Sequence, residues 1–357
     1  MAIKIGNREI GDRHSCYITF ETGPTHDGLE SAKNLVRLAA DAGADAVKFQ
    51  IFDPDKLVAD KQMTRSYEVL VDKETGETET VTETLYDILS RRCLSRPEWE
   101  EVKQLSDQLD LAFFATVGFE EDIQLLVDLG CDSLKIASAD INHWPLIRMA
   151  ARTGMCIQLD TGNATIGELE DAVEVCRNEG NEKLIIHNCP SGYPARLESI
   201  NLNFIPTLKQ MFSDYPIAYS DHTPGWEMDV AAVALGANLI EKTITVDRTT
   251  RSIEHLFSLE PLEMHSFIRI IRDVEKALGM TRRILHPEER KSRLRGRRSA
   301  FIKRTVQKGE KVSIEDIEFR RPGYGIAPHI FESLEGFVYS KNLEAGHRLS
   351  FADIDES

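Results

Sequence analysis

The 357-residue sequence lacks the features that mark a secreted or membrane-spanning protein. Its six cysteines are scattered and include no Cys-x-x-Cys pair, so neither a disulfide framework nor a zinc site of the usual spacing is expected. No apolar run approaches the ~18 residues that a membrane-spanning helix needs, and the first residues do not carry the apolar core of a signal peptide. We therefore expect reduced thiols and a cytoplasmic location.

An excess of positive charge is also absent from this chain. Asp and Glu number 59 against 43 Lys and Arg, which gives a formal net charge of −16. Nucleic acids and anionic membranes bind basic surfaces, so neither is expected as the main partner. The sequence has neither a glycine-rich phosphate loop nor the nucleophile elbow of the hydrolases. With 41% hydrophobic residues it is nevertheless able to bury a large core.

Short apolar runs that end in polar or charged residues are the most informative pattern present. Each run is followed by an amphipathic helical stretch, and there are eight such units. Parallel strands that are covered on both faces appear as continuous apolar runs, and eight of them alternating with helices predict an α/β fold, the TIM barrel. The eight runs are 17–21, 46–50, 112–116, 133–138, 156–160, 184–187, 217–222 and 239–242.

The stretches between these runs carry helix signals. Apolar residues in segment 29–39 repeat at helical spacing, and the pattern stops at Gly43, a common helix terminator. Ser95 and Glu98 have the spacing of a capping box, in which a hydroxyl and a carboxylate satisfy free amides at the start of a helix. We expect the apolar faces of these helices to pack against the barrel.

Two predicted hairpins lie outside the barrel units. Residues 1–10 alternate around a Gly6-Asn7 turn, which predicts a hairpin that closes the bottom of the barrel. Segment 67–82 holds two strand-like stretches around a glycine turn and follows the second barrel strand. Because that connection leaves from the carboxyl ends of the strands, the inserted hairpin either roofs the active site or is a solvated decoration.

The composition changes after residue 280. Domain 1–280 is followed by segment 281–298, which is rich in Arg and Lys and is interpreted as a linker or connecting arm. Residues 299–357 contain an internal repeat with a glycine turn before a short strand in each copy, which predicts a small β-rich domain. The two copies of the repeat are 308–317 and 345–354.

Polar residues at the carboxyl ends of the strands form the predicted active site, because in a TIM barrel these ends share one face. Lys48 and Lys135 follow apolar strands, where a buried ammonium group needs an anionic partner, and with nearby hydroxyls they predict a cradle for a phosphate or carboxylate. His222 is a candidate metal ligand or proton shuttle. Carboxylates at this face either act as general acids and bases or pair with the lysines. The hydroxyls are Thr116, Ser138 and Ser220, and the carboxylates are Glu21, Asp140, Glu241 and Glu254.

Ten motifs, taken jointly and in order, are typical of one family. They are Gly11-Asp12-Arg13, residues 21–28, residues 42–50, residues 135–138, Thr161-Gly162, Tyr193-Pro194, residues 219–223, Glu241-Lys242, residues 257–261 and residues 320–323. On these motifs the chain resembles, over nearly its whole length, the sialic acid synthases, which are phosphoenolpyruvate-condensing nonulosonate synthases. The resemblance implies a TIM barrel followed by an antifreeze-like (SAF) β-clip domain.

The resemblance also implies a reaction. Members of that family join C3 of phosphoenolpyruvate to the aldehyde of an open-chain N-acylated hexosamine such as N-acetylmannosamine, with a divalent metal ion such as Mn²⁺ or Mg²⁺. Water then adds at C2 and phosphate is released, so that a nonulosonic acid of the sialic type is formed. Arg321 of the small domain would reach the barrel of a partner subunit, which implies a domain-swapped homodimer.

The same resemblance assigns roles to individual residues of this sequence. Glu21, Asp140 and His222 are the expected catalytic residues. Phosphoenolpyruvate would be held by Lys48, Thr116, Lys135, Ser138, Ser191 and Ser220, and the sugar by Gln50, Tyr193, Glu254 and Arg321.

Four departures from the family pattern lie at the same face. Thr243 replaces a histidine that is the second metal ligand, Asp160 replaces a serine that contacts phosphoenolpyruvate, and Glu254 replaces a sugar-binding aspartate. Asn188 stands where a histidine commonly precedes cysteine. The carboxylate of Asp160 would repel a phosphate unless it is protonated or bound to metal. We therefore expect that Asp160 either helps His222 to hold the divalent ion or pairs with a lysine.

Two alternatives to this function stay open. The chain is either another phosphoenolpyruvate-dependent aldol-type synthase that acts on a phosphorylated aldose, or a catalytically silent sugar-binding paralogue. Thr243 and Asp160 favour the silent paralogue. Release of phosphate from phosphoenolpyruvate with a panel of aldoses separates the hypotheses, since only a silent paralogue releases none.

Overall fold

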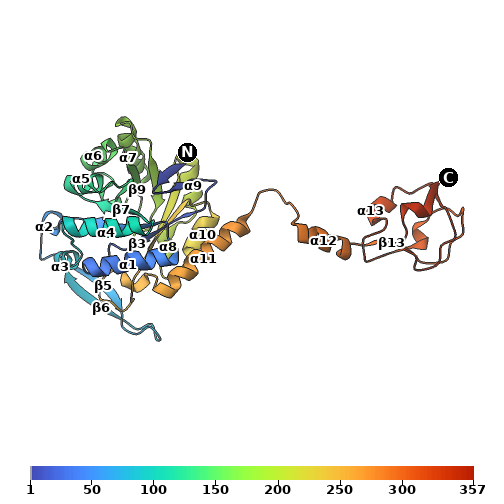
Figure 1. Cartoon of the computed structure of the whole chain (residues 1–357), viewed down its shortest axis with the longest axis horizontal. Helices are drawn as coiled ribbons and strands as arrows, with labels where there is room; N and C mark the ends of the chain where they lie inside the picture. Colours follow the sequence, from blue (N-terminus) through green and yellow to red (C-terminus); the bar gives the residue numbers. More distant parts are fainter. Residues whose placement is uncertain (1) are drawn as a thin grey trace. The chain divides into compact units, whose positions relative to one another are not determined.

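The computed structural model describes residues 2–357, which divide into two units at Gly279 and Met280. The first unit is a β/α barrel (Figure 1). Within the described residues, eight parallel strands close the barrel in the order β10-β11-β12-β3-β4-β7-β8-β9. They are β3 (Tyr17–Glu21), β4 (Ala46–Ile51), β7 (Ala112–Val117), β8 (Ser133–Ile136), β9 (Cys156–Asp160), β10 (Leu184–Asn188), β11 (Ile217–Asp221) and β12 (Leu239–Thr243).

Every apolar run predicted from the sequence is a strand of this barrel, so the prediction of a TIM barrel is confirmed. Differences are confined to the strand ends. Strand β8 stops at Ile136, and Ser138 begins a short 3₁₀ helix, η1 (Ser138–Asp140). Strand β11 stops at Asp221, so His222 is the first residue of the following loop. Both differences keep the polar residues at the carboxyl end of the barrel.

Helices cover the outside of the barrel (Figure 1). Helix α1 ends at Gly43, whose φ of 90° would strain any residue with a side chain. The predicted capping box of Ser95 and Glu98 is formed at the start of α4. No helix of the described residues is long and apolar enough to cross a membrane. The helices of this unit are α1 (Leu29–Ala42), α2 (Pro54–Leu57), α3 (Leu85–Ser90), α4 (Arg96–Gln108), α5 (Glu120–Asp128), α6 (Trp144–Arg152), α7 (Ile166–Asn178), α8 (Leu197–Ile200), α9 (Phe204–Met211), α10 (Glu227–Ala234), η2 (His255–Phe257) and α11 (Pro261–Leu278).

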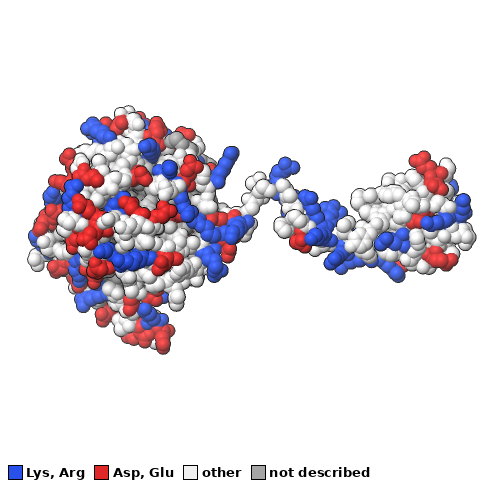
Figure 2. All heavy atoms as spheres, viewed as in Figure 1, with Lys and Arg blue, Asp and Glu red and all other residues white. Residues whose placement is uncertain are grey.

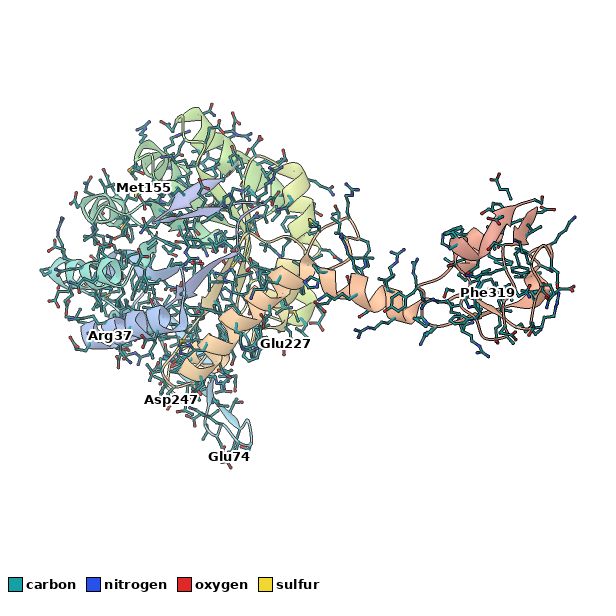
Figure 3. All side chains as sticks on the ribbon, turned by 45° about the vertical axis from the view of Figure 1, so that its right-hand side comes forward. Arg37, Glu74, Met155, Glu227, Asp247 and Phe319 are labelled. Carbon is teal, nitrogen blue, oxygen red and sulfur yellow. The ribbon has the colours of Figure 1, made fainter. Side chains whose placement is uncertain are left out.

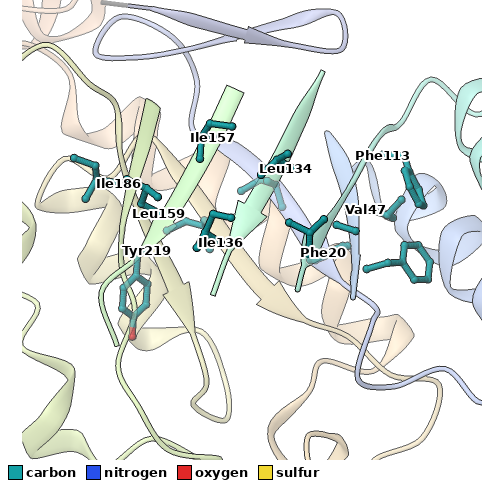
Figure 4. Packing of buried hydrophobic residues seen from close by; sticks show 14 of the residues in the cluster. Phe20, Val47, Phe113, Leu134, Ile136, Ile157, Leu159, Ile186 and Tyr219 are labelled. Atoms are coloured by element: carbon teal, nitrogen blue, oxygen red, sulfur yellow. The ribbon is translucent and has the colours of Figure 1, made fainter. Parts of the chain in front are cut away.

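Alternate residues of each strand face the helices and the barrel interior. The residues that face the helices are apolar, as are Ile18 and Phe20 of β3, and they form the main core (Figure 4). The residues between them change along the strand, from Tyr17 through Thr19 to Glu21. The barrel interior is therefore apolar at the amino ends of the strands and charged at their carboxyl ends, which we call the barrel roof.

The N-terminal hairpin closes the amino end of the barrel, as predicted. Strands β1 (Ile3–Ile5) and β2 (Arg8–Ile10) pair antiparallel, and their isoleucines pack against the first inward layer of the barrel strands. Burial of this apolar layer stabilises the fold by roughly 25 cal/mol for each Å² removed from water. We call this cluster the barrel floor; it consists of Ile3, Ile5, Ile10, Tyr17, Ala46, Phe114, Cys156, Ile185, Ala218 and Leu239.

The predicted hairpin after the second barrel strand is also present and is longer than expected. Strands β5 (Thr64–Leu70) and β6 (Thr78–Thr84) pair antiparallel, and Glu74 lies at the outer end of the hairpin (Figure 3). Near this end Lys73 forms ion pairs with Asp247 at 2.9 Å and with Glu260 at 2.6 Å. Along the hairpin, Tyr67, Val69 and Val81 pack with Ile88 and Ile253 in a small apolar cluster.

The small unit (Met280–Ser357) begins with a segment that is not a plain linker. The segment 281–298 contains helix α12 (Pro287–Gly296), which starts at a capping box of His286 and Glu289. Its residues are all exposed, and basic side chains gather on it (Figure 2). A proline at the first position, acidic residues in the first turn and basic residues in the last turn stabilise such a helix without an apolar face.

The remainder of the small unit is β-rich, as predicted. Strand β13 (Ser299–Ile302) pairs with β14 (Ile317–Arg320), and β15 (Phe337–Tyr339) pairs with β16 (Ile354–Glu356). Each copy of the repeat forms a 3₁₀ turn that leads into a strand, namely η3 (Ile314–Asp316) before β14 and η4 (Phe351–Asp353) before β16. A short helix, α13 (Pro328–Phe331), completes the unit around an apolar core of its own.

Candidate active site

One cavity lies at the barrel roof, where the strands end. We call it the roof cavity; its volume is ≈ 350 Å³. A second cavity, of ≈ 260 Å³, surrounds Asn7, Asp45 and Asp132 at the floor end and contains no residue predicted for the site. The predicted site residues that line the roof cavity are Glu21, Lys48, Gln50, Thr116, Lys135, Ser138, Asp140, Asp160, Tyr193, His222, Glu241 and Glu254.

Three predicted site residues do not line this cavity. Ser220 is buried, and its Oγ accepts a hydrogen bond from Lys135 Nζ at 2.9 Å. Ser191 is exposed and donates a hydrogen bond to the carbonyl of Gly162 at 2.7 Å. It adjoins the lining, because a side chain on Gly162 would come within 3.2 Å of Ser191 Oγ and within 3.1 Å of Ser138 Oγ. Arg321 is an exposed residue of the small unit.

Two lysines and three carboxylates form a buried charge network at the barrel roof. Lys48 Nζ donates hydrogen bonds to Glu21 and, at 2.9 Å, to Glu241. Lys135 Nζ lies 2.8 Å from both oxygens of Glu241 and 3.0 Å from Asp160 Oδ2. The sequence analysis left open whether these acids act in proton transfer or pair with the lysines. In the structure, Glu21 and Glu241 pair with the lysines. The cradle predicted from the sequence therefore has ammonium groups that are already partnered.

This network holds one more carboxylate than it has ammonium groups. Burial alone would raise the pKa of Glu241, yet Lys135 and Lys48 hold this pKa well below its ordinary value, so Glu241 stays ionised. Burial raises the pKa values of Glu21 and Asp160. Because an uncompensated buried charge is costly, protonation of one of these two acids would bring the network close to neutrality. A neutral network admits an anionic ligand at a lower cost than a fully ionised one.

A polar chain beneath the network was missed by the sequence analysis. His187 of β10 is fully buried; its Nδ1 lies 2.9 Å from Ser220 Oγ and its Nε2 lies 2.9 Å from Gln158 Oε1. Gln158 in turn donates a hydrogen bond to Ser133 Oγ at 2.9 Å. Burial lowers the pKa of His187 well below its ordinary value, so the ring is neutral. The chain fixes the hydroxyl that contacts Lys135.

His222 presents one ring nitrogen to the roof cavity. Its Nδ1 lies 3.1 Å from the carbonyl oxygen of Pro190, which can only accept a hydrogen bond, so Nδ1 carries the proton and Nε2 keeps its lone pair. Burial lowers the pKa of His222 to about 4, which keeps the ring neutral at pH 7. Tyr193 packs on the imidazole with the ring centres 4.6 Å apart. His222 is thus a fixed, neutral nitrogen ligand or proton acceptor.

Few side chains are arranged to bind a metal ion. Among residues 2–357, no group of three His, Cys, Asp or Glu side chains could hold one. Thr243, in place of the second histidine, donates a hydrogen bond to Glu254 at 3.4 Å, and Asp160 faces Lys135 and Ser220. His222 Nε2 fits a divalent ion, which would take its other ligands from substrate oxygens and water.

Two further acids of the roof cavity are suited to proton transfer. Burial, and then the negative charge of Glu21, raise the pKa of Glu254 to about 7. Burial also raises the pKa of Asp140. A carboxyl group with a pKa near 7 can donate and accept a proton at neutral pH, which is the property that general acid and base catalysis requires.

Two arginines that the sequence analysis did not single out also line the roof cavity. Arg65 comes from strand β5 of the inserted hairpin, and its guanidinium lies 5.6 Å from the ring centre of Tyr193. Arg92 follows helix α3 and is 5% exposed. Of the two interpretations of the hairpin, the structure therefore supports the one in which it contributes to the active site.

Comparison with known proteins covers both units of the chain. The NeuB family model matches residues 35–283, and the SAF domain model matches residues 297–355. The N,N'-diacetyllegionaminic acid synthase of Legionella pneumophila is 34% identical over 355 residues, which are 98% of this chain and 98% of that protein. The pseudaminic acid synthase of Helicobacter pylori is 31% identical over 95% of this chain and 98% of that protein.

Solved structures agree with these matches. The crystal structure of N-acetylneuraminic acid synthetase from Leptospira borgpetersenii, in complex with citrate, has a TM-score of 0.71 and 30% identity over 82% of this chain and 95% of that chain. A truncated 3-deoxy-D-arabino-heptulosonate 7-phosphate synthase from Thermotoga maritima has a TM-score of 0.60 at 15% identity over 78% of this chain and 94% of that chain, which supports the fold alone.

Proposed function

The chain belongs to the NeuB family, as its motifs predicted, and we propose that it condenses phosphoenolpyruvate with an N-acylated hexosamine to form a nonulosonic acid and phosphate. Members of this family are transferases, and so is this enzyme. One observation carries the proposal: in a chain with legionaminic and pseudaminic acid synthases as relatives, the polar residues that end six of the barrel strands line a single cavity.

The proposed reaction forms one carbon–carbon bond and, at C2, replaces the carbon–oxygen bond to phosphate by a carbon–oxygen bond to water. C3 of phosphoenolpyruvate bonds to the aldehyde carbon of the sugar, and the aldehyde oxygen takes up a proton. Water adds at C2, the bond from C2 to the phosphate oxygen breaks, and C2 becomes a ketone. Glu254, with a pKa of about 7, is suited to donate the first proton. Asp140, whose pKa is raised by burial, is suited to accept a proton from the water. Glu21 orients Lys48, and the free Nε2 of His222 is reserved for the divalent ion.

The donor is proposed to bind on the lysine side of the roof cavity. Lys48 and Lys135 supply positive charge there, and preorganised ammonium groups stabilise an anion more strongly in a dry site than in water. Asp160 already contacts Lys135, so the donor phosphate would share this lysine with a carboxylate. The hydroxyls proposed to complete the donor site are Thr116, Ser138, Ser191 and Ser220.

The acceptor sugar is proposed to bind against Gln50, Tyr193 and Glu254, which line the same cavity. Arg321 of a partner subunit is proposed to complete this side in a domain-swapped homodimer. A divalent ion, Mn²⁺ or Mg²⁺, held by His222 Nε2 and substrate oxygens would polarise the aldehyde when bound. All six cysteines are free, which supports a reducing, cytoplasmic location as part of the proposal.

The test is consumption of phosphoenolpyruvate with a panel of aldoses, with and without Mn²⁺ or Mg²⁺, followed by the mass of the product. We expect phosphate release that depends on the aldose and a product with the mass of the aldose plus pyruvic acid. Assays without an aldose control for simple hydrolysis. If no aldose supports consumption, the catalytically silent alternative replaces the proposal; if only aldoses without an N-acyl group react, the other aldol-type synthase replaces it.

A further inference from the structure

Arg92 is a buried cation for which the described part of the chain supplies no carboxylate within ion-pair distance. The residue is 5% exposed, and its Nη2 donates one hydrogen bond, at 3.3 Å, to the hydroxyl of Ser252. A guanidinium has five N–H donors and stays charged in proteins. A buried charge of this kind is costly unless an anion accompanies it.

Unlike Arg92, the arginines next to Arg92 and Ser252 in the sequence have a carboxylate partner. Arg91 pairs with Glu83 at 2.8 Å, and Arg251 lies 3.5 Å from the same carboxylate. Both are largely exposed, where an ion pair contributes at most about 1 kcal/mol. The chain thus gives a carboxylate to the two arginines that need it least. The buried arginine faces the roof cavity instead.

Arg92 lies on the side of the roof cavity assigned to the acceptor. The carboxylates with the largest influence on it are those of Glu254 and Glu21, although neither pairs with it. Arg65 lines the same cavity, lies over Tyr193, and forms no ion pair among residues 2–357. The lysines on the donor side, by contrast, are held by carboxylates. Positive charge that is free to meet a ligand is therefore concentrated at Arg92 and Arg65.

We propose that Arg92 and Arg65 form a subsite for a negatively charged group, a phosphate or a carboxylate, on the acceptor sugar. The proposal rests on the proposed function and narrows it to an anionic acceptor. Arginine suits this task because its planar fork binds carboxylate and phosphate oxygens in pairs. The apolar side chains of Ile88 and Ile253, which also line the cavity, strengthen the interaction by excluding water.

The first test compares three acceptors in the phosphoenolpyruvate consumption assay. They are N-acetylmannosamine, its 6-phosphate and the corresponding uronic acid. We expect kcat/KM to be at least tenfold higher for one of the two charged sugars, and the better of them identifies the group as phosphate or carboxylate. Equal or better use of the uncharged sugar would overturn the subsite.

Variants then connect this preference to Arg92. Arg92→Gln should reduce the ratio of kcat/KM between charged and uncharged acceptors tenfold or more, mainly through KM of the charged sugar, and Arg92→Lys should retain part of it. Arg91→Gln is the matched control, because it removes a neighbouring arginine outside the cavity and should leave the ratio unchanged. An equal loss with both acceptors in folded Arg92→Gln would assign Arg92 a structural role. Arg65→Gln, on the exposed hairpin, should also lower the ratio of kcat/KM between charged and uncharged acceptors. It replaces Arg92→Gln as the test variant if Arg92→Gln does not fold.

Calorimetric binding separates failure of the subsite from failure of the proposed function. Titration of the full-length chain with the 6-phosphate, the uronic acid or the plain sugar needs no turnover. If a charged sugar binds at least tenfold more tightly than the plain one, and Arg92→Gln abolishes the difference, the subsite stands even when no phosphoenolpyruvate is consumed. If condensation proceeds but binding shows no preference, the function stands and the subsite is wrong.

Discussion

The floor and the roof of the barrel are built from the same strands by opposite chemistry. At the barrel floor, Phe114 and Leu239 are apolar and pack with the isoleucines of the N-terminal hairpin. Two residues further along the same strands, Thr116 and Glu241 line the roof cavity. The floor contributes stability by removing apolar surface from water, whereas the roof holds desolvated charges at a cost in stability. Substitutions at the two ends should therefore separate folding from activity.

Lys135→Met should have the largest effect, because it removes the ammonium group that lies between Glu241 and Asp160. Breaking a buried ion network from one side lowers the free energy of unfolding by roughly 3 to 5 kcal/mol. We also expect loss of turnover, since the donor phosphate loses a cation. Chemical denaturation and phosphoenolpyruvate consumption measure the two effects.

A double variant controls for the buried charge in this experiment. Adding Asp160→Asn to Lys135→Met removes one of the orphaned carboxylates and should restore part of the stability without restoring turnover. An unchanged denaturation midpoint in the single variant would show that the charges of the roof are solvated and that the network does not stabilise the fold.

Leu239→Ala tests the floor. This side chain is fully buried, and its truncation leaves a cavity, so the free energy of unfolding should fall by roughly 2 to 5 kcal/mol. Activity per folded molecule should be preserved, because the change lies one inward layer below Glu241. Leu239→Met, which conserves volume, is the control and should cost less than about 1.5 kcal/mol. A variant that keeps its stability but loses activity would refute the separation of floor and roof.

Glu254→Gln tests how much a buried carboxylate at the roof lowers the free energy of unfolding, and how this loss depends on pH. The pKa of Glu254 is raised from 4.5 to about 7 by burial and by Glu21, so the unfolded chain releases this proton at a lower pH than the folded one. Stability is therefore lost between pH 4.5 and 7 and then stays level. Glutamine does not ionise, so the variant should gain stability relative to the parent over this window, by up to about 3 kcal/mol.

The measurement for Glu254→Gln is the free energy of unfolding at pH 4 and at pH 8. The control is Glu98→Gln, which changes an exposed capping carboxylate outside the roof cavity. Lys135→Met is unsuitable as a control because it changes the charge network itself. The Glu98→Gln control should show no gain at pH 8. A difference between parent and Glu254→Gln that does not vary with pH would mean that the acid is ionised throughout.

The barrel and the location of the site were predictable because they depend on local patterns. An apolar run of five residues with a polar end predicts a buried parallel strand, and a TIM barrel brings all such ends to one face. Glu21, Gln50 and Asp160 end the predicted runs in this way, and all three line the roof cavity. Resemblance to a family added expected roles for residues in loops, such as Tyr193.

The partners within the site were not predictable in the same way. Glu241 of β12 reaches both Lys48 of β4 and Lys135 of β8 across the barrel interior, and which acid meets which lysine depends on the strand order and stagger of the closed barrel. His187 ends the predicted run 184–187, so its polar strand-end signal was present in the sequence and was not used. Strand β10 continues to Asn188, and the inward direction of His187 follows from the period of two.

The arginines and helix α12 were missed for a different reason. Arg92 and Arg65 lie outside the strand ends, so the barrel pattern does not address them. Helix α12 buries no residue and therefore has no apolar period, which is the signal by which helices were recognised. Its proline, its cap and its charge order were present in the sequence and could have indicated a helix in segment 281–298.

Lys73→Ala should have the smallest effect, because it acts at the outer edge of the roof. Lys73 holds the inserted hairpin beside Asp247 and Glu260, on the connection that also carries Glu254. Its side chain is 41% exposed, and pairs of this kind contribute less than about 1 kcal/mol and are screened by salt. The variant should lower the unfolding free energy by that amount at low salt and by less at 1 M salt, while kcat/KM for the acceptor stays within a few-fold of the parent.

Lys61→Ala, which removes an exposed pair with Asp55 away from the Glu254 connection, is the matched control for Lys73→Ala. A large, salt-independent loss of acceptor binding in Lys73→Ala alone would show that the hairpin must be clamped for the roof to function, and the boundary between a stabilising floor and a functional roof would then extend to the hairpin tip.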